Sequence, residues 1–134
     1  MKLKISIFLA AWVLSLALTQ AQSQPGKDKY VFVISKVNYL KAIEDAVSAK
    51  GPDYLNIGEV RVILCGESVK SLQDNDPVIA KSLANGRIKL YACGLSLEQM
   101  KIDPKTISSK IPTVRNGILE AMMLIKEGYI KFDL

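Results

Sequence analysis

The sequence has no histidine and only two cysteines among its 134 residues. The absence of histidine excludes Ser-His-Asp and Cys-His catalysis, histidine metal sites and a histidine pH switch. Two cysteines are too few for a structural zinc site within one chain. Hydrophobic residues make up 49% of the chain and charged residues 23%. This composition is typical of a single globular domain.

Motifs for phosphate binding and dithiol exchange are also missing. The chain has no P-loop, no Gly-x-Gly-x-x-Gly and no Cys-x-x-Cys. The turn "SKVNYL" after the first expected strand lacks glycine, which argues against a flavin phosphate site. The net charge of +5 is dispersed along the chain, so nucleic acid is not an expected partner. We expect no cofactor and no bound metal.

The N-terminus has the pattern of a secretory signal peptide over residues 1–21. "MKLK" carries positive charge, "ISIFLAAWVLSLAL" is apolar, and "TQAQ" supplies small residues at Thr19 and Ala21. The apolar run has about 14 residues, short of the about 20 that span a bilayer. We therefore expect export to the periplasm or the cell exterior, with no stable membrane span after cleavage. A flexible leader is expected over 22–29.

Strand and helix patterns alternate through residues 30–134. Apolar, β-branched runs predict strands at 30–35, 59–64, 87–92, 113–115 and 129–134. Helices are expected between them, beginning near Asn38, Asp76, Ser96 and Ile118. Parallel strands need such crossovers. The expected fold class is therefore an α/β three-layer sandwich with a parallel sheet, flavodoxin-like in its general architecture.

Two of the expected helices carry capping signals. Asp76 is the expected N-cap of one helix, with Pro77 in its first turn and Gly86 as its C-cap. Ser96 with Gln99 three residues later fits a capping box. The third helix is therefore expected to begin at Ser96.

Two further groups of helical residues are expected to have structural roles. Three carboxylates are expected on solvated helix faces: Glu44, Asp45 and Glu120. Four apolar residues near the C-terminus are expected to make core contacts: Leu119, Met122, Met123 and Ile125.

Both cysteines come directly after a strand. In parallel α/β sheets, ligands and chemistry gather beyond the carboxyl ends of the strands. Cys65 is followed by Gly66, and Cys93 by Gly94. Glycine at these positions allows a tight turn and the close approach of a ligand or another backbone.

Cys93 is the candidate reactive thiol because a helix start follows it. The positive end of a helix dipole and its free N–H groups favour the thiolate, which is the nucleophile and can carry a persulfide. Lys89, Arg87 and Arg115 are candidates for added positive potential. The alternative is that Cys93 is plain core, since cysteine is often buried.

No expected helix follows Cys65 closely, so packing or a disulfide are rivals to a functional role there. If the second and third strands are neighbours, their ends lie about 5 Å apart, which is compatible with a disulfide. An exported chain meets an oxidising environment. A redox dithiol cycling between Cys65 and Cys93 is a further alternative.

Two segments together resemble the DsrE/DsrF-like family of sulfur-relay proteins. They are "RIKLYACGLSLEQMKI" and "IPTVRNGILEAMMLIKEGYIKFDL". The shared pattern is an apolar strand, then Cys93-Gly94 with Ser96 two residues on, then a Gly-Ile-x-Glu helix at Gly117 and a closing Gly-Tyr strand. "EVRVILCGESVKSL" is similar to the second strand and glycine turn of the family. With its signal peptide, the chain is similar to the exported single-domain branch.

The resemblance implies a five-stranded parallel sheet and a homo-oligomer, often a trimer or hexamer. It implies that Cys93 accepts sulfane sulfur as a persulfide and passes it on. Gly66, Gly94 and Ser96 are the candidate binding residues. Donor and acceptor proteins or small thiols are the implied partners. Cys65 departs from the family pattern, and we expect it to resolve the persulfide or to form a disulfide with Cys93. Whether such a chain is a sulfurtransferase-like enzyme or only a carrier stays open.

A different class of function fits the same sequence. The chain would be a non-enzymatic oligomeric binding module that takes a small anion or a protein partner at the strand ends. Both cysteines would then be structural or disulfide-bonded.

Overall fold

The computed structural model describes residues 27–49, 56–132 and 134. The predicted signal peptide and most of the predicted leader lie outside these residues. The strands are β1 (Asp28–Ile34), β2 (Ile57–Leu64), β3 (Ile88–Cys93), β4 (Thr113–Val114) and β5 (Ile130–Phe132). The α-helices are α1 (Asn38–Ser48), α2 (Pro77–Ala84), α3 (Gly94–Gln99) and α4 (Gly117–Lys126). Two 3₁₀ helices, η1 (Gly66–Leu72) and η2 (Pro104–Thr106), complete the set.

The five strands form one sheet in the order β4-β3-β2-β1-β5, and every pairing is parallel. The predicted α/β class with a five-stranded parallel sheet is confirmed. The central strands β2 and β3 are in register from Val60↔Ile88 to Leu64↔Ala92. Cys65 and Cys93 each follow the last of these pairs by one residue.

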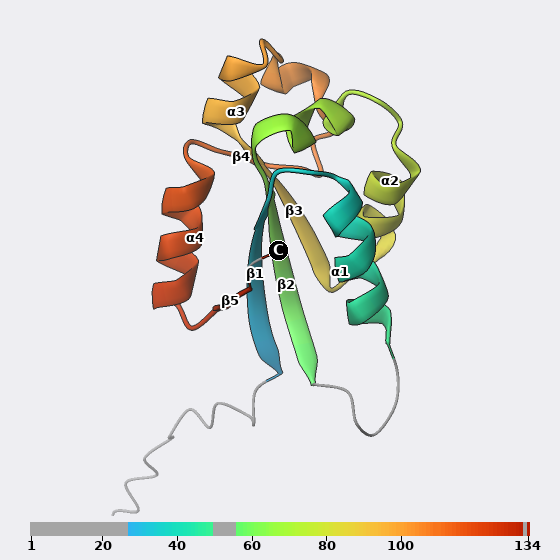
Figure 1. Cartoon of the computed structure of the whole chain (residues 1–134), viewed down its shortest axis with the longest axis vertical. Helices are drawn as coiled ribbons and strands as arrows, with labels where there is room; N and C mark the ends of the chain where they lie inside the picture. Colours follow the sequence, from blue (N-terminus) through green and yellow to red (C-terminus); the bar gives the residue numbers. More distant parts are fainter. Residues whose placement is uncertain (1–26, 50–55, 133) are drawn as a thin grey trace, which may run out of the picture.

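Side chains of alternate strand residues build two cores, one on each face of the sheet. On one face, Val62, Leu64 and Leu90 pack with residues of α1, α2, η1 and α3. On the other face, Ile63 and Cys93 pack with residues of α4. Figure 1 shows the resulting three layers, with α1 and α2 on one side of the sheet and α4 on the other. α3 and η1 cover the carboxyl ends of the strands.

Several element boundaries differ from the predicted ones. β1 begins at Asp28, so the last two residues of the predicted leader already belong to the sheet. The Asp76 side chain caps α2 as predicted, accepting from the N–H of Val78 at 2.8 Å. α2 ends at Ala84 with Asn85 as its C-cap, so Gly86 is one residue beyond the cap it was predicted to form.

Two structural roles assigned to helical side chains were wrong. Glu44 is buried between α1 and α2, with only 3% of its surface exposed. Its carboxylate lies near Ser48, Lys81 and Asn85. The four apolar residues of α4 that were expected in the core are exposed instead: Leu119, Met122, Met123 and Ile125.

α4 is apolar on nearly all sides, and the sheet covers only one of them. Gly117, Ala121 and Leu124 are its buried residues. A single helix lying on a sheet can turn only one of its sides toward the sheet. The remaining apolar residues of α4 therefore point away from it. Among the described residues, no helix is both long and apolar enough to cross a membrane.

Candidate functional site

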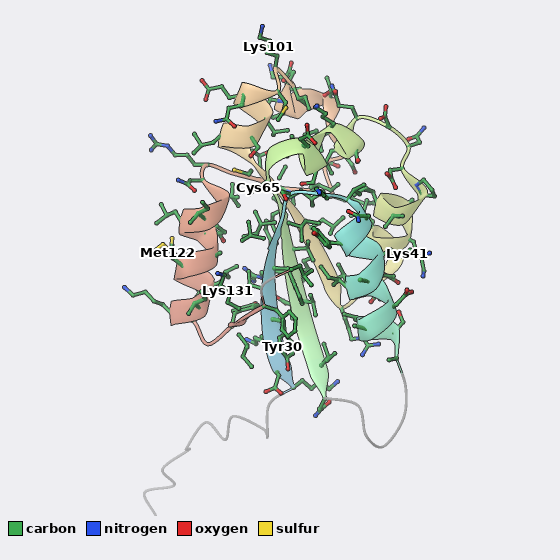
Figure 2. All side chains as sticks on the ribbon, in the orientation of Figure 1. Tyr30, Lys41, Cys65, Lys101, Met122 and Lys131 are labelled. Atoms are coloured by element: carbon green, nitrogen blue, oxygen red, sulfur yellow. The ribbon has the colours of Figure 1, made fainter. Side chains whose placement is uncertain are left out.

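The two cysteines meet at the carboxyl ends of β2 and β3, the neighbouring strands at the centre of the sheet. Both are free thiols, and their side chains are hydrogen-bonded to each other. Cys93 is only 5% exposed, whereas Cys65 is partly exposed beneath η1 (Figure 2). The prediction that the two sulfurs share one edge of the sheet is therefore confirmed.

Cys93 lies at the N-terminal ends of two helices. It is the N-cap residue of α3, which begins at Gly94. Its sulfur also accepts the backbone N–H of Gly117, the first residue of α4, at 3.3 Å. Helix N-termini carry unpaired N–H groups and a positive partial charge. Both helices therefore favour negative charge on the Cys93 sulfur.

Hydrogen bonding lowers the pKa of Cys93 despite its burial. Burial is the largest single effect and opposes the thiolate. It is outweighed by hydrogen bonds from the Ser96 hydroxyl, the backbone N–H groups of Gly117 and Ser96, and the Cys65 thiol. A thiolate stabilised in this way is the nucleophilic form of cysteine.

The pKa of Cys65 moves in the opposite direction, to about 12. Burial is the main cause, and the negative charge of the neighbouring Cys93 and the hydrogen bond to it add to the rise. When two coupled acids share a site, one ionises and holds the other protonated. Of the two thiols, Cys93 is therefore the one that ionises first, and Cys65 keeps its proton.

Ser96 contributes to this site in a way that the capping-box prediction missed. α3 begins two residues earlier than predicted, so Ser96 is inside the helix and does not cap it. The Ser96 Oγ instead accepts the backbone N–H of Gly66 at 2.8 Å. Its own proton is then free to be donated to a sulfur, and Ser96 lowers the pKa of both cysteines.

The two glycines that follow the cysteines shape the site differently. Gly66 has φ +52°, in the left-handed region that favours glycine, and its N–H fixes Ser96. A Cβ on Gly94 would lie 3.0 Å from the carbonyl oxygen of Val114. Gly94 therefore allows α3 to start against β4.

Gly117 is the site residue that the sequence analysis did not select. A Cβ on it would lie 2.6 Å from the sulfur of Cys65 and 3.2 Å from the Cβ of Cys93. The missing side chain thus makes room for both cysteines, while the Gly117 N–H contacts one of them. The sequence signal for this position was the dipeptide Asn116-Gly117, which marks the start of α4. The Asn116 side chain caps this helix by accepting the N–H groups of Ile118 and Leu119.

Of the three basic residues suggested as a source of positive potential, Lys89 lies away from the cysteines, whereas the backbone of Arg115 borders the turn at Gly94. Lys89 donates to Glu59 at 2.6 Å, near the amino end of β2. Glu59 also accepts hydrogen bonds from Arg61 and the Tyr129 hydroxyl. These bonds bind Lys89 into a separate polar cluster on the α4 side of the sheet. Within the described residues, the hydrogen bonds of Arg87 and Arg115 are made by their backbone atoms.

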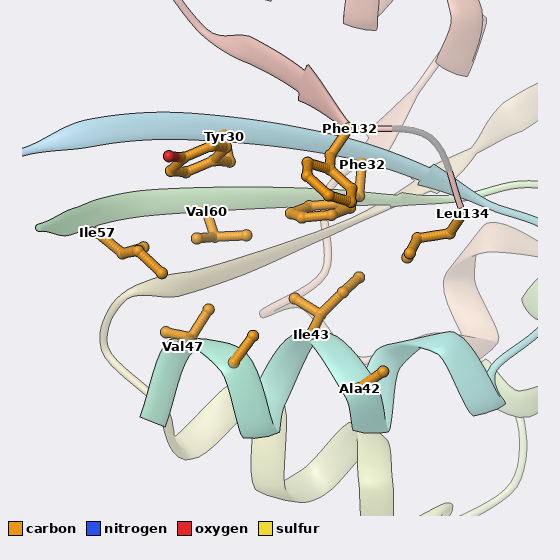
Figure 3. Close-up of a pocket in the computed structure, with 10 residues that line it drawn as sticks. Tyr30, Phe32, Ala42, Ile43, Val47, Ile57, Val60, Phe132 and Leu134 are labelled. Carbon is orange, nitrogen blue, oxygen red and sulfur yellow. The ribbon is translucent and has the colours of Figure 1, made fainter. Parts of the chain in front are cut away.

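An apolar pocket lies on the opposite face of the sheet from the cysteines, between the sheet and α1. It has a volume of about 270 Å³, and its walls include Tyr30, Phe32, Ile43 and Phe132 (Figure 3). Neither cysteine lines it. In the part of the chain that the structure describes, no group of three or more Cys, Asp or Glu residues is placed to hold a metal.

The fold and the position of the site define an α/β protein with a thiol pair at the carboxyl edge of a parallel sheet. No protein-family model matches the chain, and no curated protein matches it. Several solved structures share the fold, among them two of proteins of unknown function.

The first is MTH1491 from Methanobacterium thermoautotrophicum, with a TM-score of 0.65, 13% identity, and coverage of 81% of this chain and 100% of that chain. The second is BT1422 from Bacteroides thetaiotaomicron, with a TM-score of 0.53, 18% identity, and coverage of 80% and 95%. At these identities the likeness concerns the fold alone.

Proposed function

We propose that the chain is a sulfur-relay protein of the DsrE/DsrF-like kind that carries sulfane sulfur as a persulfide on Cys93. The observation that carries this proposal is the contact of the Cys93 sulfur with the N–H of Gly117 at the start of α4. This N–H and the Ser96 hydroxyl stabilise negative charge on the sulfur. The same groups would stabilise a persulfide anion, which forms when a thiolate attacks a sulfane sulfur donor.

The burial of Cys93 restricts which donors can reach it. With 5% of its surface exposed, the sulfur is accessible to a small donor such as an inorganic polysulfide or thiosulfate. A bulky donor requires the surrounding turns to open. Small inorganic donors are therefore the favoured substrate class.

Sulfur loading of two single-cysteine variants tests this proposal. Cys65→Ser retains Cys93 and is expected to gain the mass of one sulfur atom after incubation with polysulfide under anaerobic conditions. Cys93→Ser is expected to gain none, because the remaining thiol has its pKa raised by burial. A persulfide on Cys93→Ser, or no adduct on either variant, would contradict the proposal.

The competing class, a binding module with structural cysteines, predicts a different thiol titration. A reactive Cys93 gives one thiol that reacts quickly with a small alkylating reagent in the native protein. Two thiols that react only after denaturation would favour the binding module.

We also propose that the chain forms a homo-oligomer through the outer face of α4. Ile118 and Met122 are 66% and 59% exposed, and Ile125 continues their stripe. Residues at i, i+4 and i+7 lie on one side of a helix. An apolar helix face of this kind is complementary to a second copy of itself across a twofold axis. Exposed apolar patches on soluble proteins commonly mark such interfaces.

A charge placed on the α4 face tests the assembly. Met122→Glu is expected to shift the protein to monomer in light scattering coupled to size-exclusion chromatography, because a buried unpaired carboxylate is costly. Lys41→Glu is the control, since Lys41 is on α1 on the other side of the sheet (Figure 2). A wild-type monomer, or an unchanged oligomer in Met122→Glu, would contradict this interface.

Export is a further part of the proposal and depends on residues 1–21. If the signal is cleaved after Ala21, the mature protein begins at Gln22. N-terminal sequencing of the protein expressed at full length in a secreting host tests this position. A chain that retains Met1 would contradict it.

A further inference from the structure

The position of the second sulfur bears on what happens to a persulfide once it has formed. The side chains of Cys65 and Cys93 are hydrogen-bonded to each other. Gly117 is packed against both of them, and even a methyl group on it would clash with the Cys65 sulfur. The two sulfurs therefore share a confined space at the ends of adjacent strands.

The contact between the Cys65 and Cys93 side chains involves one particular sulfur of a persulfide on Cys93. In Cys93–S–S⁻, the inner sulfur is the Sγ atom of Cys93, which is the atom that Cys65 already contacts. The outer sulfur is the one added by the donor. Thiol–disulfide exchange requires the attacking sulfur to reach the sulfur that it will bond to. Cys65 is thus placed to attack the inner sulfur and to displace the outer one.

We propose that Cys65 discharges the Cys93 persulfide as sulfide, leaving a Cys65–Cys93 disulfide. This inference rests on the proposed function and concerns the fate of the sulfur at the same site. The S–S bond to the outer sulfur breaks, and a bond forms between the two cysteine sulfurs. The sulfane sulfur is reduced to hydrosulfide, HS⁻, and the two cysteines supply both electrons. The Cys65 proton leaves with the departing sulfur, so the charge balances.

The protonation of the pair fits this sequence of events. The pKa of Cys65 is raised to about 12, so it holds its proton at neutral pH until a leaving group takes it. The Cys65 thiol is hydrogen-bonded to the Cys93 sulfur, and the Ser96 hydroxyl interacts with both. Proton transfer within this group of three side chains avoids forming a free Cys65 thiolate in a buried place.

The exposure of the two cysteines indicates how the dithiol is restored. Cys65 is partly exposed and Cys93 is buried, so an external dithiol reductant meets the Cys65 sulfur of the disulfide first. Attack there expels Cys93, whose thiolate is the stabilised leaving group. With a dithiol present, the cycle turns over and converts sulfane sulfur to sulfide. Without it, each chain reacts once.

The test compares wild type with Cys65→Ser after reduction, removal of reductant and anaerobic addition of inorganic polysulfide. Wild type is expected to lose two hydrogen atoms in intact mass. It is also expected to release one more sulfide per chain than Cys65→Ser, which keeps an added sulfur atom. Cys65→Ala serves as a second variant, and circular dichroism checks that each chain is folded.

The outcomes separate this inference from the proposed function. A wild-type chain that holds its persulfide as stably as Cys65→Ser would overturn the discharge while leaving sulfur carriage intact. A wild-type disulfide without the additional sulfide would overturn it too, since the electrons then went to another acceptor. No adduct on either Cys65 variant would refute the proposed function itself, and the discharge with it.

Discussion

The backbone N–H of Gly117 donates to the sulfur of Cys93 at 3.3 Å, although 24 residues separate them in the chain. This contact joins the end of β3 to the start of α4. It gives the cysteine a donor that its own strand and turn do not supply. The same glycine leaves space for Cys65, so one residue contributes both to the stabilised charge on Cys93 and to the proximity of the two sulfurs.

Substitution Gly117→Ala is expected to destabilise the protein by about 1–3 kcal/mol, the usual cost of overpacking a well-packed site. The added Cβ would lie 2.6 Å from Cys65 Sγ and 2.8 Å from Cγ2 of Ile63. Urea unfolding measures the change. Gly86→Ala is the matched control, because no atom lies within 4 Å of its added Cβ. Equal stability of the two variants would show that the sulfur site is not tightly packed.

Substitution Ser96→Ala is expected to raise the pKa of Cys93, since the Ser96 hydroxyl is the largest of the effects that lower it. Hydrogen bonds to charged groups contribute about 1.5–3 kcal/mol. The rate of Cys93 alkylation by iodoacetamide at neutral pH should therefore fall by about tenfold or more, and its pH profile should move to higher pH. Ser109→Ala, at an exposed position, is the control. An unmoved profile in Ser96→Ala would remove Ser96 from the site.

Substitution Cys93→Ser is expected to lower the pKa of Cys65 from about 12. Burial, the main cause of the raised value, remains, but the negative charge of the neighbouring sulfur is gone. Like charges at close range disfavour each other's ionisation. Alkylation of Cys65, followed by peptide mass spectrometry as a function of pH, should begin at lower pH in the variant than in wild type. A later onset in the variant would contradict the assignment of charge within the pair.

The parallel sheet and the meeting of the two cysteines were predictable because they follow from local patterns. Continuous apolar runs mark buried parallel strands, and two of these runs end at a cysteine followed by glycine. Parallel strands place all their carboxyl ends at one edge. No knowledge of the tertiary packing was needed for Cys65 and Cys93 to be selected.

The remaining parts of the site depend on packing between segments distant in sequence. Ser96 satisfies a capping pattern, yet α3 already begins at Gly94, two residues before it. The Ser96 hydroxyl oxygen instead accepts the backbone N–H of Gly66. Ser96 takes the second role because Gly66 begins η1, a helix that the sequence did not predict. The apolar residues of α4 were assigned to the core because a helix that is apolar on all sides has no periodicity to distinguish a buried face from an exposed one.

Glu59 is expected to make stability depend on pH below about 5. Burial opposes its ionisation, but hydrogen bonds from Lys89, Tyr129 and Arg61 outweigh it and hold its pKa at about 2 in the folded protein, against 4.5 ordinarily. A depressed folded pKa stabilises the native state above the unfolded value, and this stabilisation is lost as pH falls toward 2. The carboxylate is about a quarter exposed, so its contribution is on the order of 2 kcal/mol after solvent screening.

Urea unfolding of wild type and Glu59→Gln between pH 7 and pH 2 measures this contribution. The variant should be less stable at pH 7, and the difference should shrink as the pH falls through the interval from 4.5 to 2. Glu67→Gln is the control, since Glu67 is 74% exposed and its ion pair, at 3.6 Å, is with the exposed Lys70. Its stability should follow wild type at every pH. A constant difference between Glu59→Gln and wild type across this range would show that Glu59 acts by packing and not by its charge, because protonation would then leave its contribution unchanged.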